Sequence, residues 1–146
     1  MDLAKMLTDM VPFIGTVGLV FDHIGPGEAR AVLPYRPAVG NHIGTAHAGA
    51  VYTLGESASG GVVLSLFADQ LPLGGFIALK GSQVTHTKAA PGDVVATARL
   101  TGDAHAVRSA YDESGRVDFD VEVVMTVGAV ETARVTYTWA VRAPRS

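Results

Sequence analysis

The sequence contains no cysteine among its 146 residues. This absence excludes disulfide frameworks, thiolate nucleophiles and most structural zinc sites. Positive charge is also sparse, because 11 lysines and arginines are scattered among 14 acidic residues and the formal net charge is −3. Proteins that bind nucleic acid carry a basic stripe or tail, and this chain has neither. We therefore expect no nucleic-acid partner.

Familiar catalytic and targeting motifs are missing as well. The sequence has no Gly-x-Ser-x-Gly nucleophile elbow, no phosphate-binding loop and no dinucleotide fingerprint. Its five histidines lack the spacing of a known metal-ligand set, so we expect neither a metal nor another cofactor. Residues 1–10 lack the apolar core of a signal peptide, which predicts a cytoplasmic protein.

The chain has enough apolar side chains for one domain, which we expect to span residues 1–146. Hydrophobic residues make up 48% of the sequence, and the length is too short for two ordinary domains. The longest apolar region, residues 46–67, approaches membrane-spanning length but contains Glu56 and many small residues. It has no proline and is apolar or small on nearly every side. We therefore predict a long helix buried inside the protein, and no membrane partner.

The segments around this helix have the patterns of a short helix and several strands. Residues 1–10 carry apolar side chains at helical spacing. Strands are expected at residues 16–24, 29–33, 76–87, 93–100, 118–127 and 130–141. The last two strands alternate between apolar and polar side chains, as in a sheet with one wet face. Residues 104–115 permit either a helical turn or a loop.

This order of elements predicts an α+β fold, in which an antiparallel sheet wraps around one long central helix. The outer face and the edge strands of such a sheet need cover, and pairing with a second copy readily supplies it. We therefore expect a homodimer or a homotetramer.

Glu56 is the only Asp, Glu, Lys or Arg between Arg36 and Asp69, and it lies in the middle of the most apolar helix. Burial in apolar surroundings raises the pKa of a carboxylate and destabilises the fold unless donors surround the group. We interpret Glu56 as a general base or a nucleophile. The alternative is a structural glutamate that is hydrogen-bonded to nearby backbone or to Ser57 and Ser59.

The start of the predicted helix is a second candidate site. Its first backbone N–H groups are unpaired and lie at the positive end of the helix dipole. Those of Ala48, Gly49 or Ala50 are therefore candidate donors to a developing oxyanion. The alternative is an ordinary helix start that is capped by Thr45 and binds no ligand.

The two candidate sites are too far apart to meet within one helix. His47 and Glu56 are nine residues apart, which corresponds to about 13 Å along an ideal helix. If they belong to one reaction centre, a second subunit must supply one of them. This spacing predicts active sites at a subunit interface.

The pattern Asn41-x-x-Gly44-x-x-His47-x-Gly49, followed by Glu56, resembles that of the hotdog-fold acyl-CoA thioesterases. It is most similar to the phenylacetyl-CoA and 4-hydroxybenzoyl-CoA thioesterase branch, and the expected strand order agrees across nearly the whole chain. The resemblance implies a hotdog fold. It also implies hydrolysis of an acyl-CoA-like thioester to a free acid and a thiol.

The resemblance also assigns roles to individual residues. Glu56 matches the carboxylate that activates water or attacks the thioester carbonyl, and Asn41 matches the amide that positions water or substrate. Ala48 stands where the family usually has a glycine whose backbone N–H polarises the thioester oxygen, with Gly49 beside it. His47 matches a histidine that organises the loop.

Two positions depart from the family pattern. Ala48 adds a methyl group, and Gly60 stands where some relatives have Thr or Ser one turn after the carboxylate. These departures leave open a non-catalytic hotdog protein that binds acyl-CoA. A hydratase is disfavoured because the His-Phe-Pro-Gly run of such relatives is missing.

Coenzyme A needs cationic contacts for its phosphates. Four candidates follow the predicted helix, namely Lys80, Lys88, Arg99 and Arg108. Lys88 is the preferred one, because it ends a strand at a position where relatives often carry Lys or Arg. Candidate lining residues of an acyl pocket are Phe67, Leu71, Leu73 and Phe76, although each fits an ordinary core equally well.

Overall fold

The computed structural model describes residues 1–145, within which six strands form one antiparallel sheet around a long helix. The elements along the chain are α1 (Leu3–Met10), α2 (Pro12–Val17), β1 (Val20–Gly25), β2 (Glu28–Leu33), η1 (Pro37–Val39), α3 (Ala48–Phe67), η2 (Ala68–Leu73), β3 (Phe76–His86), β4 (Val94–Leu100), α4 (Ala104–Ser114), β5 (Arg116–Val127) and β6 (Val130–Arg142).

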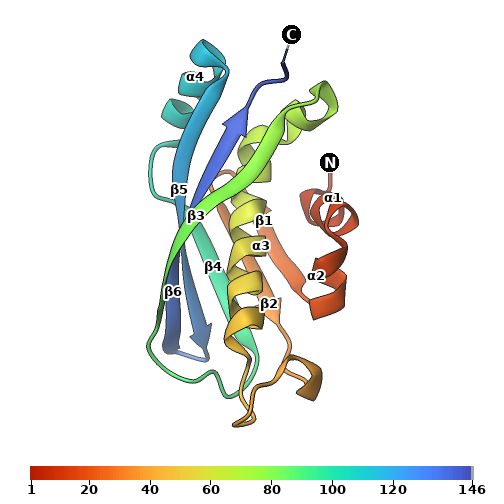
Figure 1. Cartoon of the computed structure of the whole chain (residues 1–146), viewed down its shortest axis with the longest axis vertical. Helices are drawn as coiled ribbons and strands as arrows, with labels where there is room; N and C mark the ends of the chain where they lie inside the picture. The colour runs from red at the N-terminus through yellow and green to blue at the C-terminus, as the bar shows by residue number, and fades with distance from the viewer. Residues whose placement is uncertain (146) are drawn as a thin grey trace.

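The sheet has the strand order β1-β2-β4-β5-β6-β3, and all neighbouring strands are antiparallel. It curls around α3, which lies along its concave face (Figure 1). The inward side chains of β5 and β6 alternate with outward polar ones, because successive residues of a strand point to opposite faces. This arrangement is the expected hotdog fold.

Small residues let α3 pack closely against the sheet. A Cβ atom placed on Gly55 would lie 2.6 Å from Met125 Cε, and one on Gly61 would lie 3.1 Å from Ala29 Cβ. Real Cβ atoms essentially never approach another atom to within 3.0 Å, so Gly55 has no space for a side chain. The Tyr137 hydroxyl then donates to the carbonyl of Tyr52 (2.7 Å) and ties β6 to the helix.

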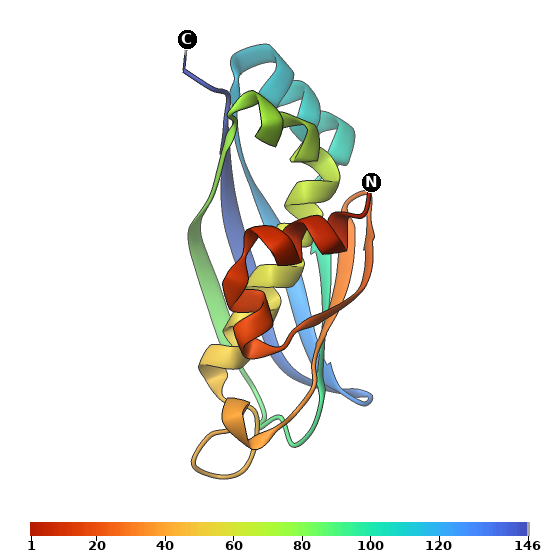
Figure 2. The ribbon, with the colours of Figure 1, turned by 90° about the vertical axis from the view of Figure 1, so that its right-hand side faces the viewer.

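The N-terminal segment differs from the expectation. Residues 16–24 do not form one strand, because Pro12–Val17 is the helix α2 and β1 begins only at Val20. Pro12 stands in the first turn of α2, where its fixed φ favours a helix and its missing N–H is not needed. Gly18, with φ +83°, ends the helix in the left-handed region. Together α1 and α2 cross α3 (Figure 2).

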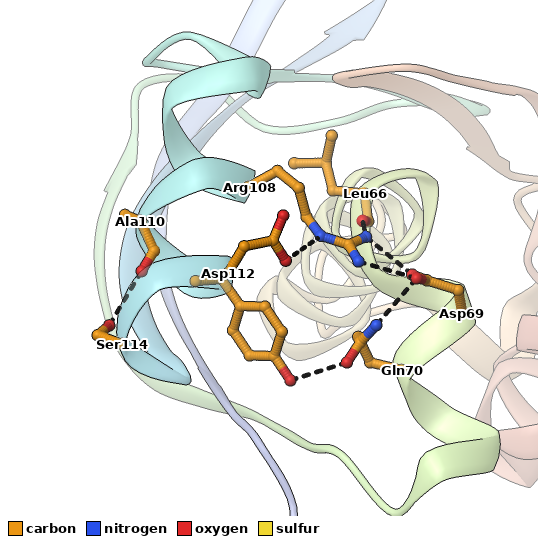
Figure 3. Close-up of polar contacts among 8 residues, drawn as sticks. Leu66, Asp69, Gln70, Arg108, Ala110, Asp112 and Ser114 are labelled. Atoms are coloured by element: carbon orange, nitrogen blue, oxygen red, sulfur yellow. Dashed lines mark hydrogen bonds and ion pairs between the residues drawn. The ribbon is translucent and has the colours of Figure 1, made fainter.

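The segment that the sequence left undecided, residues 104–115, is the helix α4. Its N-cap is Asp103, whose carboxylate accepts from the N–H of Ala106 (2.9 Å). Arg108 on α4 donates to the carbonyl of Leu66 (2.9 Å) and forms ion pairs with Asp69 and Asp112 (Figure 3). These contacts fasten α4 to the C-terminal end of α3.

The sheet ends on one side in β3, which pairs only with β6 among the described strands. Its side chains from Lys80 to His86 are exposed, including the apolar Val84 at 38%. An eleven-residue edge strand with unpaired backbone groups is a template for pairing with another chain.

Helices in the described part of the chain are too short or too polar to cross a membrane. The most apolar one, α3, is instead enclosed by the sheet on one side and touched by α1 and α2.

Candidate active site

The carboxylate of Glu56 lies on α3 at the edge of a cavity of about 300 Å³. The side chain is half-buried, and burial raises the pKa of its carboxyl above the ordinary value. Among residues 1–145 no ion pair or hydrogen bond compensates for this burial, so desolvation alone sets the direction of the shift. A carboxyl with a raised pKa and no partner is typical of a catalytic acid or base.

The polar groups near Glu56 are satisfied by one another and leave its carboxylate alone. The indole N–H of Trp139 donates to Ser59 Oγ (3.0 Å), and the Ser59 hydroxyl donates to the backbone carbonyl of Glu56 (2.7 Å). Neither serine that could have anchored a structural glutamate bonds to the carboxylate within residues 1–145. Ser59 bonds to the backbone, and no hydrogen bond joins Ser57 to Glu56. This pattern favours the catalytic interpretation of Glu56.

The cavity beside Glu56 is lined almost entirely by apolar groups. Its walls come from α1, the α1–α2 junction, α2, α3, η2, β3 and β6. Leu7 closes it from α1, Gly60 and Val63 form part of the helix wall, and Trp139 forms part of the sheet wall. The cavity is thus built from segments that are far apart in the sequence.

The start of α3 is capped by His47 and not by Thr45. His47 has extended backbone angles, and its Nδ1 accepts from the N–H of Gly49 (2.8 Å). The first intrahelical bond is the one from the N–H of Val51 to the carbonyl of His47 (3.0 Å). Because Gly49 is engaged by the cap, the N–H of Ala48 is the better candidate for an oxyanion donor.

The amide of Asn41 is engaged within its own loop. Its Nδ2 donates to Thr45 Oγ1 (2.8 Å), and its Oδ1 accepts from the N–H groups of Ile43 (3.1 Å) and Thr45 (3.0 Å). The side chain therefore shapes the loop that leads into α3. If Asn41 contacts a substrate or water, it would do so in addition to these hydrogen bonds within the loop.

Lys88 differs from the other three candidate cations. Within residues 1–145, Lys80 pairs with Asp118, Arg99 with Glu28 and Arg108 with Asp69, whereas no acidic partner lies within reach of Lys88. Lys88 lines a shallow cavity of about 180 Å³ together with Asn41 and Ala48. An exposed, unpaired ammonium group next to a helix start is suited to binding an anion.

The candidate residues thus fall into separate places on one chain. Asn41, Ala48 and Lys88 share one cavity, His47 and Gly49 line a second, and Glu56 lines a third. The structure brings the loop and the helix start together and does not bring Glu56 to them. This separation follows from the rise of the helix between the two positions.

Of the four residues expected to line an acyl pocket, one lines the cavity beside Glu56. Leu71 lines the cavity, but Phe67 is fully buried against Tyr111 and Phe119 in the core. Leu73 and Phe76 are 64% and 60% exposed and lie outside this cavity.

The sequence predicted alternation along β6, the strand that carries Trp139. It held no sign that Leu7 would meet Trp139 at the same cavity, because no local pattern relates residues so far apart in the chain. No three His, Asp or Glu side chains gather into a possible metal site in the described part of the chain.

The six-stranded antiparallel sheet around one long helix defines this chain as a hotdog-fold protein. Solved structures with the same fold include a Pseudomonas aeruginosa protein of unknown function described as a probable thioesterase, which is 23% identical, with 97% of this chain and 94% of that chain covered and a TM-score of 0.82. A thioesterase family protein from Silicibacter pomeroyi is 20% identical, with 98% of both chains covered and a TM-score of 0.78.

A mutant of the phenylacetic acid degradation protein PaaI from Thermus thermophilus is 22% identical, with 90% of this chain and 99% of that chain covered and a TM-score of 0.70. No curated protein matches the chain. The model of the family described as a domain of unknown function (DUF4442) matches residues 2–141, so the chain belongs to this family.

Proposed function

We propose that this protein hydrolyses an acyl-CoA-like thioester with Glu56 as its catalytic carboxylate. The observation that carries the proposal is the Glu56 carboxylate, which lines a largely apolar cavity and has no hydrogen-bond or ion-pair partner within residues 1–145. The cavity offers a place for an acyl group, and the Glu56 carboxylate beside it would face the thioester carbonyl. The thioesterase names of the structural relatives support the reaction class.

Hydrolysis requires two things of the site: a group that drives the attack on the carbonyl carbon, and donors that stabilise the charge on the carbonyl oxygen. Glu56 either draws a proton from the attacking water or attacks the carbonyl carbon itself to form a transient anhydride. In both cases negative charge develops on the carbonyl oxygen and needs donors that are already in place. The N–H of Ala48 at the positive end of the α3 dipole supplies such a donor.

Ala48 and Glu56 of one chain are eight residues apart, so we infer that a homodimer forms each active site from two subunits. Tyr52 lies midway between them, and its hydroxyl bonds to Ser82 Oγ (2.9 Å) near the centre of the edge strand β3. A two-fold axis beside Ser82 would pair two copies of β3 in antiparallel fashion. The same axis would place Ala48 of one subunit opposite Glu56 of the other.

Lys88 is the residue that we propose for contact with the phosphates of coenzyme A. It has no acidic partner within residues 1–145 and shares a cavity with Ala48, the proposed oxyanion donor. This placement leaves the thioester near the helix start and the nucleotide outside the protein. The acyl group then enters the cavity beside Glu56.

Thiol release from a panel of short, medium and aromatic acyl-CoAs tests the proposal. Glu56→Gln should lower kcat/KM by about 10²–10⁴-fold while circular dichroism shows an intact fold. The matched control is Glu113→Gln, the same substitution at an exposed position of α4. Turnover that Glu56→Gln leaves unchanged would contradict the mechanism. Absence of turnover on every ester, with acyl-CoA still bound, would establish a binding protein instead.

A further inference from the structure

The glycines of α3 differ in what surrounds them. Gly55 and Gly61 face the sheet so closely that an added Cβ would crowd Met125 or Ala29. Gly60 has room, because an added Cβ would lie 3.9 Å from the Trp139 ring and 4.0 Å from Leu7 Cδ2, which are ordinary contact distances. Close packing of the helix therefore does not explain a glycine at position 60.

Gly60 lies one turn after Glu56, so both residues are on the same face of α3. Both line the cavity of about 300 Å³ that runs between α3 and α1. A side chain at position 60 would project into this space between Glu56 and Leu7. Gly60 itself contributes no side chain to this cavity, which both Glu56 and Leu7 of α1 also line.

The residues that line this cavity favour one chemical class of acyl group. Glu56 is its only charged residue in the described part of the chain, and no lysine or arginine lines it. An acyl group with a terminal carboxylate would lose its hydration there without gaining a partner, and it would also meet the charge of Glu56. The volume is at the lower end of the range for ligand pockets, which suits a compact acyl group.

We propose that Gly60 determines acyl specificity, by opening a pocket for an uncharged aliphatic or aromatic acyl group that extends from Glu56 to Leu7. This inference rests on the proposed thioesterase function for the reaction, but not for the binding of the apolar group. Side chains at position 60 set the depth of the pocket, and the helix α1 closes its end.

The kinetic test measures kcat/KM along a series of straight-chain acyl-CoAs, with phenylacetyl-CoA and succinyl-CoA added. The wild type should reach its maximum at an intermediate chain length and discriminate strongly against succinyl-CoA. The test quantity is the ratio of kcat/KM for the best wild-type substrate to kcat/KM for butyryl-CoA. This ratio should fall by about 3–10-fold in Gly60→Ala and by about 100-fold in Gly60→Leu. The optimum should shift towards shorter chains.

A matched control uses the same substitutions at Gly15, an exposed glycine of α2 where nothing lies within 4 Å of an added Cβ. Gly15→Ala and Gly15→Leu should leave the chain-length profile unchanged. Gly60→Ala should also raise Tm by about 2–5 °C, because alanine favours the helix and clashes with nothing. Gly60→Ala thus keeps the test valid even if Gly60→Leu fails to fold.

A second test needs no catalysis. Trp139 is the only tryptophan of the chain and lines the cavity, so tryptophan fluorescence reports on this site alone. The neutral probe 8-bromo-1-octanol should quench this fluorescence saturably in the wild type, through contact with its bromine atom. The apparent affinity should fall at least about tenfold in Gly60→Leu, because the larger side chain occupies the pocket.

The two tests separate the failure of the reaction from the failure of the pocket. Saturable quenching that Gly60→Leu abolishes, without turnover of any thioester, would refute the proposed reaction and support the pocket. A chain-length profile and a quenching curve that are identical in the wild type, Gly60→Ala and a folded Gly60→Leu would refute the role of Gly60. Efficient hydrolysis of succinyl-CoA would refute the selection against charge.

Discussion

At the scale of single residues, the burial of Glu56 affects both the stability of the fold and the proposed chemistry. Burial raises the pKa of its carboxyl, which means that the folded state holds the proton more tightly than the unfolded state does. The same desolvation makes an ionised carboxylate a better base towards water or a better nucleophile. Activity and stability should therefore respond to pH in opposite directions around this residue.

The pH dependence of kcat/KM follows from the active form of Glu56. Because the carboxylate must be ionised to act as base or nucleophile, activity should fall as the pH drops through its raised pKa. The midpoint of this acid limb should lie above the ordinary value of 4.5. Steady-state rates from acidic to neutral pH measure it. A midpoint at or below 4.5 would contradict the assignment of the limb to a buried Glu56.

The pH dependence of stability has the opposite sign. The folded protein binds more protons than the unfolded chain between pH 4.5 and the raised pKa of Glu56, so its contribution to stability falls as the pH rises through this window. Glu56→Gln should therefore raise Tm at neutral pH and lose this advantage below pH 4.5. Thermal unfolding of both proteins at the two pH values tests this. An advantage that grows on acidification would contradict it.

At the scale of elements, the start of α3 depends on one side chain. The imidazole of His47 satisfies the N–H of Gly49 and so performs the work usually done by Ser, Thr, Asp or Asn. The helix start in turn sets the direction of the Ala48 N–H. A cap of this kind links local stability to the position of the proposed oxyanion donor.

Replacement of the cap should reveal this link. His47→Ala should lower the free energy of unfolding by about 1 kcal/mol, and His47→Asn should restore most of it, since asparagine is a good N-cap. Urea denaturation measures both changes. If His47 acts only as a positioning residue, kcat/KM should recover in His47→Asn as well. A full loss of activity in a stable His47→Asn would instead assign a chemical role to the imidazole.

The helix α4 is held by a compact ion-pair cluster. Arg108 donates to the carbonyl of Leu66 and forms a two-bond contact with Asp69 (Figure 3). Its guanidinium lies over the rings of Phe67 and Tyr111. The Arg108 guanidinium also holds the pKa of the Asp69 carboxyl below its usual range. The cluster closes the end of the core at a place that does not line the Glu56 cavity.

Loss of this cluster should affect stability and leave catalysis intact. Arg108→Met keeps the apolar stem but removes the hydrogen bonds, and it should lower the free energy of unfolding by about 1–3 kcal/mol. Chemical denaturation measures the loss, and kcat/KM below the unfolding transition should match the wild type. A large drop in kcat/KM in the folded variant would place α4 in the active site.

At the scale of the whole molecule, the proposed homodimer would form each active site from Ala48 of one subunit and Glu56 of the other. The proposed donor at Ala48 is its backbone N–H, which a change of side chain alone leaves in place. Ala48→Pro removes this N–H and keeps the helix, since proline is well tolerated at the first helical position. His47 before it already has the extended backbone that proline requires. This substitution should lower kcat/KM by about 10²–10³-fold, and Ala48→Gly is the control that keeps the donor.

Mixed dimers decide whether two subunits build each site. Equal amounts of Glu56→Gln and Ala48→Pro, unfolded together and refolded, should regain about a quarter of wild-type activity, because half of the dimers then hold one intact site of two. Each variant refolded alone is the control. No recovery on mixing would show that each site lies within one subunit.

The edge strand β3 should carry the dimer contact. Ser82→Asp would place two like charges beside each other at the proposed two-fold axis, and it should turn the dimer into monomers at micromolar concentration. Val20→Asp makes a charge at an exposed position of β1, the other edge of the sheet, and should leave the dimer intact. Sedimentation velocity measures both. Dissociation by Val20→Asp alone would move the interface to β1.

The sequence by itself determined most of the elements and the catalytic candidate. Alternation in β5 and β6 and the apolar run of α3 depend on neighbours along the chain, and these patterns set local structure. The isolated charge of Glu56 could be recognised because every residue around it is apolar or small. The end of α2 at Val17 and the later start of β1 at Val20 were missed, since Pro12 permits either the end of one helix or the start of another.

Only the tertiary structure decided what each side chain faces. No local pattern tells what surrounds Gly55, Gly60 and Gly61. Their surroundings differ because Met125, Trp139 and Ala29 reach them from strands elsewhere in the chain. The same holds for Lys88, whose lack of an acidic partner within residues 1–145 depends on where the chain places its carboxylates. The periodicity and composition of a segment determine its secondary structure and which of its faces points inward. A cavity, in contrast, forms between elements, and its shape follows from how those elements pack.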